Sequence, residues 1–173
     1  MAAQQEFWFV THTESKRELY IGDLLEKLHV VHYLPTYVVV RQTRHEQYQR
    51  IKVPIVNNLL FIKATEENFL ALVKNKSYNL CYIKDSDTDL PFTVPDKQMN
   101  DFMYLMSRSS QKALILPENN VAQGDKVRIL GGDFLGMEGE AIQTGGKTYI
   151  TARIPKLLIA GIEISEDHWE RLG

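Results

Sequence analysis

Residues 124–139 read Gly-Asp-Lys-Val-Arg-Ile-Leu-Gly-Gly-Asp-Phe-Leu-Gly-Met-Glu-Gly, and this stretch decides the fold of the second half of the chain. Val127, Arg128 and Ile129 alternate apolar and polar side chains as a half-buried strand does. The glycines that follow supply the positive φ angles that the corners of a small, sharply bent barrel need. Phe134 gives this turn an aromatic side chain to bury. The stretch therefore predicts a strand, a glycine turn and a returning strand in a small β-barrel.

Length, charge and cysteine content limit the class of protein. The chain has 173 residues, 44% of them hydrophobic, which is enough for one medium and one small core. Its net charge of −2 gives no global attraction to nucleic acid. The single cysteine, Cys81, lies in an apolar run and is expected to be a buried, reduced thiol. No apolar run approaches the roughly 20 residues of a membrane span and no signal pattern is present, so we expect a cytoplasmic protein.

The first part of the chain alternates strand-like and helix-like segments. Strands are expected at 7–10, at 29–40 with a bend at Pro35, at 51–62 and at 78–83, with a polar hairpin connection at 42–49. Ser15 and Glu18 form a capping box pattern ahead of a first amphipathic helix. Further helices are expected around 69–73 and from Pro95 onward. This pattern predicts an α+β N-terminal domain with an antiparallel sheet flanked by helices.

A change of composition divides the chain into two domains. Short polar stretches occur at 107–112 and 117–123, so we expect an N-terminal domain at 1–106, a linker at 107–122 and an all-β barrel at 123–173. Up to residue 117 there are 14 basic and 13 acidic residues, and beyond it 6 basic and 9 acidic, which gives net charges of +1 and −3. The barrel is therefore the acidic part and a poor candidate for binding phosphate.

The glycine-rich stretch resembles the KOW motif, which occurs in NusG-type transcription factors and some ribosomal proteins as an SH3-like barrel. The motif has Pro where Asp133 stands here, a residue that a turn also accepts. The positions that carry the resemblance are Gly124, Asp125, Val127, Gly132, Phe134, Gly136 and Gly139.

The N-terminal part is similar to the N-terminal (NGN) domain of the NusG family. The Trp8-Phe9-Val10 strand, the Lys16-Arg17-Glu18 helix start and the 53–62 strand occur in the family's order. Residues 94–99 are similar to the specialised UpxY-type antiterminators. The general factor has a Pro-Gly-Tyr near 57–59 and a Gly where Lys16 stands, and these departures indicate a specialised paralogue.

The resemblance implies a site for RNA polymerase on the N-terminal sheet. In the family, an aromatic-lined concavity receives the clamp helices of the largest subunit, and the matching residues here are Trp8, Leu59 and Phe61. Thr65 and Asn68 match the region that touches the opposite side of the polymerase cleft. The alternative is that Trp8, Leu59 and Phe61 are ordinary core residues.

A second candidate surface is basic. Arg41, Arg44 and Arg50 lie in and around the polar hairpin connection together with Tyr48. Arginine binds backbone phosphate, and a tyrosine can stack on an unpaired base, so we expect contact with the non-template DNA strand or nascent RNA. Lys16 and Arg17 are expected to join this face. The alternative is a solvated hairpin with no binding role.

Several patterns that resemble catalytic or metal sites are rejected. Residues 141–148 match the spacing of a P-loop, but a β-branched segment ending at Pro155 follows instead of a helix, so a β-hairpin turn is expected. His29 and His32 have no neighbouring Cys or carboxylate cluster, and residues 85–89 lack the downstream residues of a calcium loop. We expect no enzyme, no metal and no cofactor.

The resemblance to the NusG family implies a transcription elongation or antitermination factor that binds RNA polymerase and suppresses pausing or termination. The barrel is expected to recruit the termination factor Rho or a small-subunit ribosomal protein. One relative, RfaH, hides its polymerase site under a refolded helical hairpin. Here β-favouring residues and glycines predict a five-stranded barrel in the intact chain, which would leave Trp8 and Phe61 available. The alternative function is a ribosome-associated or RNA-binding KOW protein.

Overall fold

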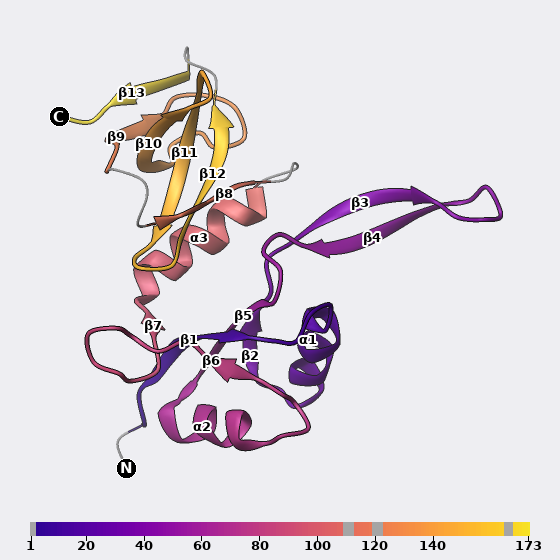
Figure 1. Cartoon of the computed structure of the whole chain (residues 1–173). Helices are drawn as coiled ribbons and strands as arrows, with labels where there is room; N and C mark the ends of the chain where they lie inside the picture. The colour runs from indigo at the N-terminus through magenta and orange to yellow at the C-terminus, as the bar shows by residue number, and fades with distance from the viewer. Residues whose placement is uncertain (1–2, 109–112, 119–122, 165–167) are drawn as a thin grey trace. The chain divides into compact units, whose positions relative to one another are not determined.

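The chain folds into two compact units of different class. The computed structural model describes residues 3–108, 113–118, 123–164 and 168–173. Its compact units are Met1–Asp96 and Lys97–Gly173 (Figure 1). The first unit combines an antiparallel sheet with two helices, and the second carries a six-stranded antiparallel sheet together with helix α3. The predicted fold class is confirmed.

An antiparallel sheet forms the centre of the first unit. Strand β1 (Glu6–His12) pairs along its whole length with β5 (Leu59–Thr65), with Trp8 opposite Lys63 and Val10 opposite Phe61. The sheet order is β2-β5-β1-β6, and β7 also pairs with β1. The three short strands are β2 (Val31–Tyr33), β6 (Cys81–Tyr82) and β7 (Thr93–Val94). Cys81 is exposed, so the expected buried thiol is wrong: β6 is a short strand and not the interior of an apolar run.

Helices α1 (Glu18–Lys27) and α2 (Glu66–Lys74) cover one face of this sheet. The aromatic rings of Phe9 on β1 and Phe69 on α2 stack with centroids 4.0 Å apart. The core cluster on this face consists of Phe9, Ile21, Leu25, Leu60, Ile62, Ala64, Phe69 and Leu80. Burial of these side chains is the main stabilising contribution to the first unit.

Helix α1 starts without the expected capping box. It begins at Glu18, its N-cap residue is Arg17, and no side chain caps it. Lys16, at φ 64°, turns the chain just before the helix. The carboxylate of Glu18 is buried and accepts a hydrogen bond of 2.5 Å from the backbone N–H of Asn58. Glu18 therefore ties the helix to the loop before β5 instead of closing its own first turn.

Two long predicted strands are each divided into two pieces. Within the described part of the chain, strand β3 (Thr36–Gln42) pairs only with β4 (Tyr48–Pro54), and these strands form a separate ribbon that extends away from the sheet (Figure 1). Ile55 donates its backbone N–H to the carbonyl of Pro35 at 2.9 Å. This hydrogen bond joins the start of β3 to the end of β4 at the base of the ribbon. Pro35 has no N–H to donate to a sheet ladder, and Asn58 has φ 64°. These two residues explain why neither strand continues.

The second unit is built on the predicted barrel strands. The strand order is β13-β9-β10-β11-β12-β8, which is six strands where five were expected. The hairpin between β10 and β11 turns through Gly145 and Gly146 at φ 58° and 74°, the pattern of a type I′ turn. Strand β11 follows the turn directly, where a phosphate-binding loop would need a helix. The expected β-hairpin is therefore confirmed. The bounds are β9 (Asp125–Ile129), β10 (Glu138–Thr144), β11 (Lys147–Ile154), β12 (Leu158–Ile164) and β13 (Trp169–Arg171).

The sixth strand lies in the segment that was expected to be a linker. Strand β8 (Leu114–Pro117) pairs with β12, with Leu116 opposite Ile159. Its Leu-Ile-Leu sequence is apolar enough to join a sheet although polar residues flank it. Helix α3 (Asp96–Arg108) falls almost wholly in the second compact unit. The domain limits 1–106, 107–122 and 123–173 stay a prediction, and residues 109–112 and 119–122 lie outside the described part.

Close backbone contact makes Gly124 a required glycine. A Cβ atom at this position would lie 1.9 Å from the carbonyl oxygen of Ala141, a distance that no side chain tolerates. The Gly124 N–H donates to the carboxylate of Glu140 at 2.6 Å. The start of β9 is therefore held against β10 by a backbone contact and a charge-assisted hydrogen bond.

Glu140 is also the centre of a half-buried ionic network. Its two oxygens accept from Nη2 and Nε of Arg153 at 2.5 and 3.0 Å, and Arg153 Nη1 donates to Glu118 at 3.1 Å. Burial opposes ionisation of Glu140. The hydrogen bonds from Arg153 and Gly124 and the charge of Arg153 nevertheless hold its pKa below the ordinary value. The network links β10 and β11 to Glu118, the residue directly after β8, through charge.

We expect Gly124→Ala to destabilise the second unit by about 1–3 kcal/mol, because the added methyl forces β9 and β10 apart. Guanidinium unfolding followed by Trp169 fluorescence, in a Trp8→Phe background, measures the change. Gly131→Ala is the control, since the nearest atoms to a Cβ there are side-chain carbons of His168 at 3.8 Å. Equal effects of the two substitutions would contradict the close-contact explanation.

We expect Glu140→Gln to lower the free energy of unfolding of the second unit by about 1–2 kcal/mol near pH 7. The folded pKa of Glu140 is lowered, so its ionic contribution is present above the unfolded pKa of about 4.3 and is lost as pH falls through the folded value. The difference between wild type and variant should therefore shrink below about pH 4 in the same unfolding assay. Glu138→Gln, in an exposed pair with Arg128, should have a smaller effect. A pH-independent difference would show that the charge is not responsible.

Candidate functional site

The three residues expected to contact RNA polymerase lie together on one face of the first sheet. In the β1–β5 register, Trp8 is opposite Lys63, Val10 is opposite Phe61 and His12 is opposite Leu59, and paired residues point to the same side. Phe9, Leu60 and Ile62 point to the other side, into the core under α1 and α2. We call the first side the Trp8 face, defined by Trp8, Val10, Leu59, Phe61 and Lys63.

Apart from the half-buried Lys63, the Trp8 face is apolar and buried in this structure. The exposed fractions of Trp8, Leu59 and Phe61 are 5%, 2% and 0%, although these side chains were expected to be available. Tyr33 on β2 lies opposite Phe61, with ring centroids 6.4 Å apart, and burial raises its pKa to about 12. The Nζ of Lys63 lies 5.9 Å from the centroid of the Trp8 ring. Trp8, Leu59 and Phe61 therefore share one face of the sheet, and their exposure is that of core residues.

Thr65 and Asn68 have a structural role at the start of α2. The Thr65 hydroxyl accepts a 3.2 Å hydrogen bond from the backbone N–H of Asn68, which makes Thr65 the N-cap of the helix. This N-cap satisfies one of the free N–H groups of the first turn. The capping contact accounts for Thr65, while the Asn68 side chain is exposed and remains accessible to a partner.

The basic residues of the β3–β4 ribbon are divided between its two faces. Val40 pairs with Arg50, and Arg41 pairs with Gln49, so Arg41 and Arg50 point to opposite sides. Arg44 lies in the connection between the strands, where Thr43 N–H donates to Gln47 at 2.8 Å. All three arginines are exposed and face solvent.

One face of this ribbon combines Tyr48 and cationic side chains, which the sequence analysis had grouped, with exposed valines, which it had not identified. The apolar members Val38, Val40 and Tyr48 are 54%, 61% and 76% exposed. Arg50 and Lys52 lie across from Val40 and Val38 on the same side. The sequence has three consecutive valines at 38–40, so only the β3–β4 register shows which of them share a face with Tyr48 and Arg50.

Lys16 and Arg17 lie at the entrance to α1. Lys16 is exposed, whereas Arg17 pairs with Glu14 at 3.2 Å and its guanidinium lies 5.1 Å from the ring centroid of Tyr20. Tyr20 is 58% exposed and was also missed, because nothing in the sequence separates an exposed helical tyrosine from a buried one. Arg17 is thus already partnered, and Lys16 is the more accessible cation.

The residues that resemble a KOW motif form the β9–β10 corner. Asp125 begins β9, and Val127 is fully buried. Gly132 and Gly136 have φ 79° and 82°, and Gly136 N–H closes the turn by donating to Ile129 at 2.8 Å. A Cβ at Gly139 would lie 3.1 Å from Ile150. Phe134 is half-buried. The glycines therefore serve the backbone, as the sequence indicated.

The described residues were also searched for clusters of metal-binding side chains and for helices long and apolar enough to cross a membrane. Among the described residues no three metal-binding side chains lie close enough together to form a metal site. The helices of the described part are all too short or too polar to cross a membrane.

Comparisons with known proteins place this geometry in a family. The family model described as "Transcription termination factor nusG" matches residues 6–103, more than half of the chain. No curated protein matches the sequence. A solved structure titled "Domain interaction in Thermotoga maritima NusG" is similar, with 16% identity over 98% of each chain and a TM-score of 0.47. On the strength of the family model, which spans the whole first sheet, both of its helices and the Trp8 face, the chain belongs to the NusG family.

Proposed function

We propose that this protein is a transcription elongation factor that binds RNA polymerase through its N-terminal unit and suppresses pausing or termination. The observation that carries the proposal is the family match over residues 6–103, which contains the Trp8 face and the β3–β4 ribbon. The protein acts as a binding factor and not as an enzyme. It works in the cytoplasm, where it meets the polymerase.

The Trp8 face is the proposed anchor for the polymerase clamp helices. Large aromatic side chains bury much area at low entropic cost, which suits Trp8 and Phe61 to the centre of an interface. A factor that prefers the closed clamp by about 1–3 kcal/mol shifts the clamp equilibrium 5- to 150-fold and so disfavours pausing. Because this face is buried in the free chain, binding must include a step that uncovers it.

The β3–β4 ribbon is the proposed contact with nucleic acid at the transcription bubble. Its tip and both faces carry arginine, so phosphate is within reach on either side. Tyr48, which is 76% exposed, offers a stacking surface to an unpaired base of the non-template strand or the nascent RNA. Lys16, exposed just before α1, is proposed as a further cation for this contact.

The protein is further proposed to be a specialised, operon-directed paralogue of the UpxY type. The support is the sequence at 94–99 and the replacement of a Pro-Gly-Tyr by Asn57-Asn58-Leu59. The second unit is proposed to be a KOW barrel that recruits Rho or a small-subunit ribosomal protein. Its glycine corner has the backbone geometry that such a barrel requires.

The competing function is a ribosome-associated or RNA-binding KOW protein. Such a protein would carry a net positive charge, whereas the part of the chain beyond residue 117 has 6 basic and 9 acidic residues. A pull-down with core RNA polymerase separates the two functions. Retention of the intact chain and of residues 1–110, but not of residues 115–173, supports the polymerase proposal. Retention by ribosomes alone would overturn it.

We expect Phe61→Leu to weaken binding to core RNA polymerase by about 2 kcal/mol, measured as the dissociation constant of the labelled intact chain. Phe69→Leu is the matched control, since both phenylalanines are fully buried but Phe69 lies in the core on the opposite side of the sheet. Both variants lose a similar amount of stability, so a loss of affinity for Phe61→Leu alone identifies the Trp8 face. Equal polymerase affinities of the Phe61→Leu and Phe69→Leu variants would show that Phe61 is an ordinary core residue like Phe69.

We expect the combined substitution of Arg41, Arg44 and Arg50 by Gln to leave polymerase affinity nearly unchanged and to reduce crosslinking to the non-template strand. The salt dependence of that crosslinking should flatten by about one unit of slope for each phosphate that an arginine no longer neutralises. Single substitutions then show which face of the ribbon is used, because Arg41 and Arg50 point to opposite sides. Replacement of the exposed Lys27, Lys74 and Lys76 by Gln removes the same number of positive charges and controls for net charge. An unchanged salt slope would indicate a solvated ribbon.

A further inference from the structure

The two faces of the β3–β4 ribbon differ in how their side chains are arranged. One face carries two parallel columns of exposed side chains, Tyr48, Arg50 and Lys52 on β4 and Gln42, Val40 and Val38 directly across from them on β3. Side chains directly across a ladder lie side by side, so a row of two cations runs next to a row of two valines. We call this side of the ribbon the Tyr48 face.

The opposite face, which also lies wholly within the described residues, has a different arrangement. Its apolar members are half-buried, namely Tyr37, Val39, Ile51 and Val53. Its cation is Arg41, which lies near the connecting turn and across from the neutral Gln49. Val38 and Val40 are, by contrast, 54% and 61% exposed. A ligand that needs both free apolar surface and adjacent cations therefore fits the Tyr48 face.

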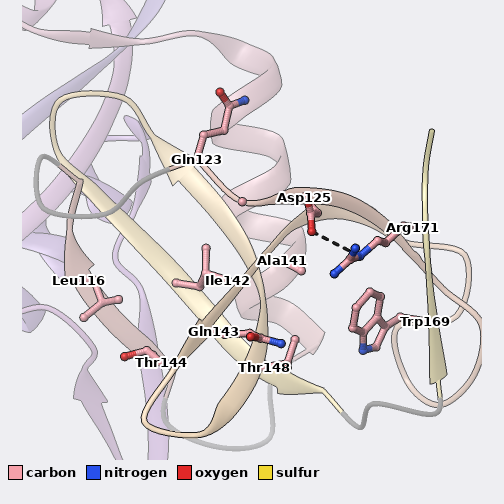
Figure 2. A pocket seen from close by; sticks show the side chains of 11 residues that line it. Leu116, Gln123, Asp125, Ala141, Ile142, Gln143, Thr144, Thr148, Trp169 and Arg171 are labelled. Carbon is pink, nitrogen blue, oxygen red and sulfur yellow. Dashed lines mark ion pairs between the residues drawn. The ribbon is translucent and has the colours of Figure 1, made fainter.

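The charge of the ribbon points to an anionic ligand. Residues 36–54 contain four basic residues and one acidic residue, a net charge of +3 in a chain whose net charge is −2. In the described part of the chain, Arg50 and Lys52 take part in no ion pair. Arg171 in the second unit, by contrast, is already paired with Asp125 at 3.3 Å (Figure 2). A polyanion therefore meets free cations on the ribbon.

The same charges disfavour two other occupants of the Tyr48 face. A second copy of this chain would bring its own Arg50 and Lys52 against those of the first, and like charges repel. A purely apolar protein surface would bury both cations without a counter-charge. Nucleic acid, however, supplies phosphates for the cations and flat aromatic bases for Tyr48 and the valines.

The apolar half of the face distinguishes a single strand from a duplex. In a duplex the flat faces of the bases are stacked on one another, so Tyr48 and the valines would meet mainly base edges, sugars and phosphates. In an unpaired strand those flat faces are available, and an exposed tyrosine gains stacking with any base. The Tyr48 face therefore fits an unpaired strand better than a duplex.

We propose that the Tyr48 face binds a short stretch of single-stranded nucleic acid in one orientation across the ribbon. The sugar–phosphate backbone follows Arg50 and Lys52 on β4, and the bases lie over Val40 and Val38 on β3. Tyr48 stacks on the base nearest the connecting turn. The inference rests on the nucleic-acid contact proposed above for the ribbon and adds a face, an orientation and a strand type to it.

The consecutive valines give the test an internal control, because Val38 and Val40 belong to the Tyr48 face and Val39 to the opposite face. The intact chain, with ¹³C-labelled valine methyl groups, is titrated with an oligothymidylate of about eight nucleotides. We expect saturable shifts with a dissociation constant of about 10⁻⁴ M at roughly 0.15 M salt. Nuclear Overhauser contacts to thymine protons are expected from the methyl groups of Val38 and Val40, and not from Val39.

Two matched probes separate the parts of the ligand at the same salt concentration. An abasic oligomer with the same number of phosphates should bind about tenfold more weakly, since it offers no ring to Tyr48. The duplex of the oligothymidylate with oligoadenylate should also bind more weakly than the single strand, because its base faces are already stacked.

Variants then examine the side chains. Tyr48→Leu keeps an apolar side chain but removes the ring, and should weaken the oligothymidylate about tenfold while changing the affinity for the abasic oligomer little. Arg50→Gln should reduce the slope of log affinity against log salt by about 0.7, and Arg41→Gln should reduce it less. Lys76→Gln, at an exposed position outside the ribbon, controls for net charge. An unshifted Val39 methyl signal shows that the ribbon of each variant keeps its fold.

Four results would overturn the proposal. These are no saturable shift at about 2 mM oligothymidylate, contacts from Val39 instead of Val38 and Val40, tighter binding of the duplex, and a loss of affinity for core polymerase in Tyr48→Leu without a loss of oligothymidylate affinity. The last result would assign the face to a protein partner.

Polymerase binding is measured separately with the pull-down described above. Loss of oligothymidylate binding with polymerase binding retained removes this inference and leaves the polymerase proposal in place. Retained oligothymidylate binding without polymerase binding removes only the polymerase proposal. Contacts from Val39, or tighter binding of the duplex, remove the face or the strand type and leave a nucleic-acid contact of the ribbon standing.

Discussion

The antiparallel pairing of β1 with β5 is the constraint on which the first unit depends. Seven consecutive residue pairs fix the register, from Glu6 opposite Thr65 to His12 opposite Leu59. Side chains alternate along a strand, so this register sends Phe9, Leu60 and Ile62 under α1 and α2 and sends Trp8 and Phe61 to the other side. A slip by one residue would exchange the two sets completely. The core and the proposed polymerase anchor are therefore two consequences of a single pairing.

The same pairing determines where the β3–β4 ribbon begins. The ribbon leaves the sheet where Ile55 bonds to Pro35, and the chain returns to β5 through Asn58. Asn58 is held by the buried carboxylate of Glu18, and its own carbonyl accepts from Thr13 at 2.9 Å. An isolated two-stranded ribbon is only marginally stable in water, so the hydrogen bonds at its base are needed to stabilise it. Helix α1 thus holds, through Glu18, the loop by which the chain returns from the ribbon to β5.

The sequence allowed prediction of those features that depend on local chemistry. The Gly145-Gly146 hairpin and the glycine corner at 131–136 were predictable, because positive φ angles leave a compositional mark. The capping box was wrong because Glu18 has a long-range partner, Asn58, that no local pattern contains. Strand β8 was missed because its four residues join the sheet only through β12. The division of arginines between two faces required the β3–β4 register, and the burial of Trp8 required the whole fold. Local sequence patterns therefore predict turns and the types of elements. Which side chains share a face, and which are buried, depends on strand pairing between residues far apart in the sequence.

The burial of the Trp8 face has a thermodynamic consequence for a protein that uses it to bind. If only a fraction of the molecules exposes the face at a given time, the apparent dissociation constant rises by the inverse of that fraction. The cost is the free energy of uncovering Trp8, Leu59 and Phe61, and each of these large apolar side chains contributes about 1.5–3 kcal/mol when it moves from water to a buried position. A partner that buries the same side chains returns that free energy on binding, so the net cost is confined to the rearrangement itself. An apolar face is then compatible with both the free and the bound chain. It stabilises the free chain while its side chains are buried, and it stabilises the complex once a partner of complementary shape buries the same side chains.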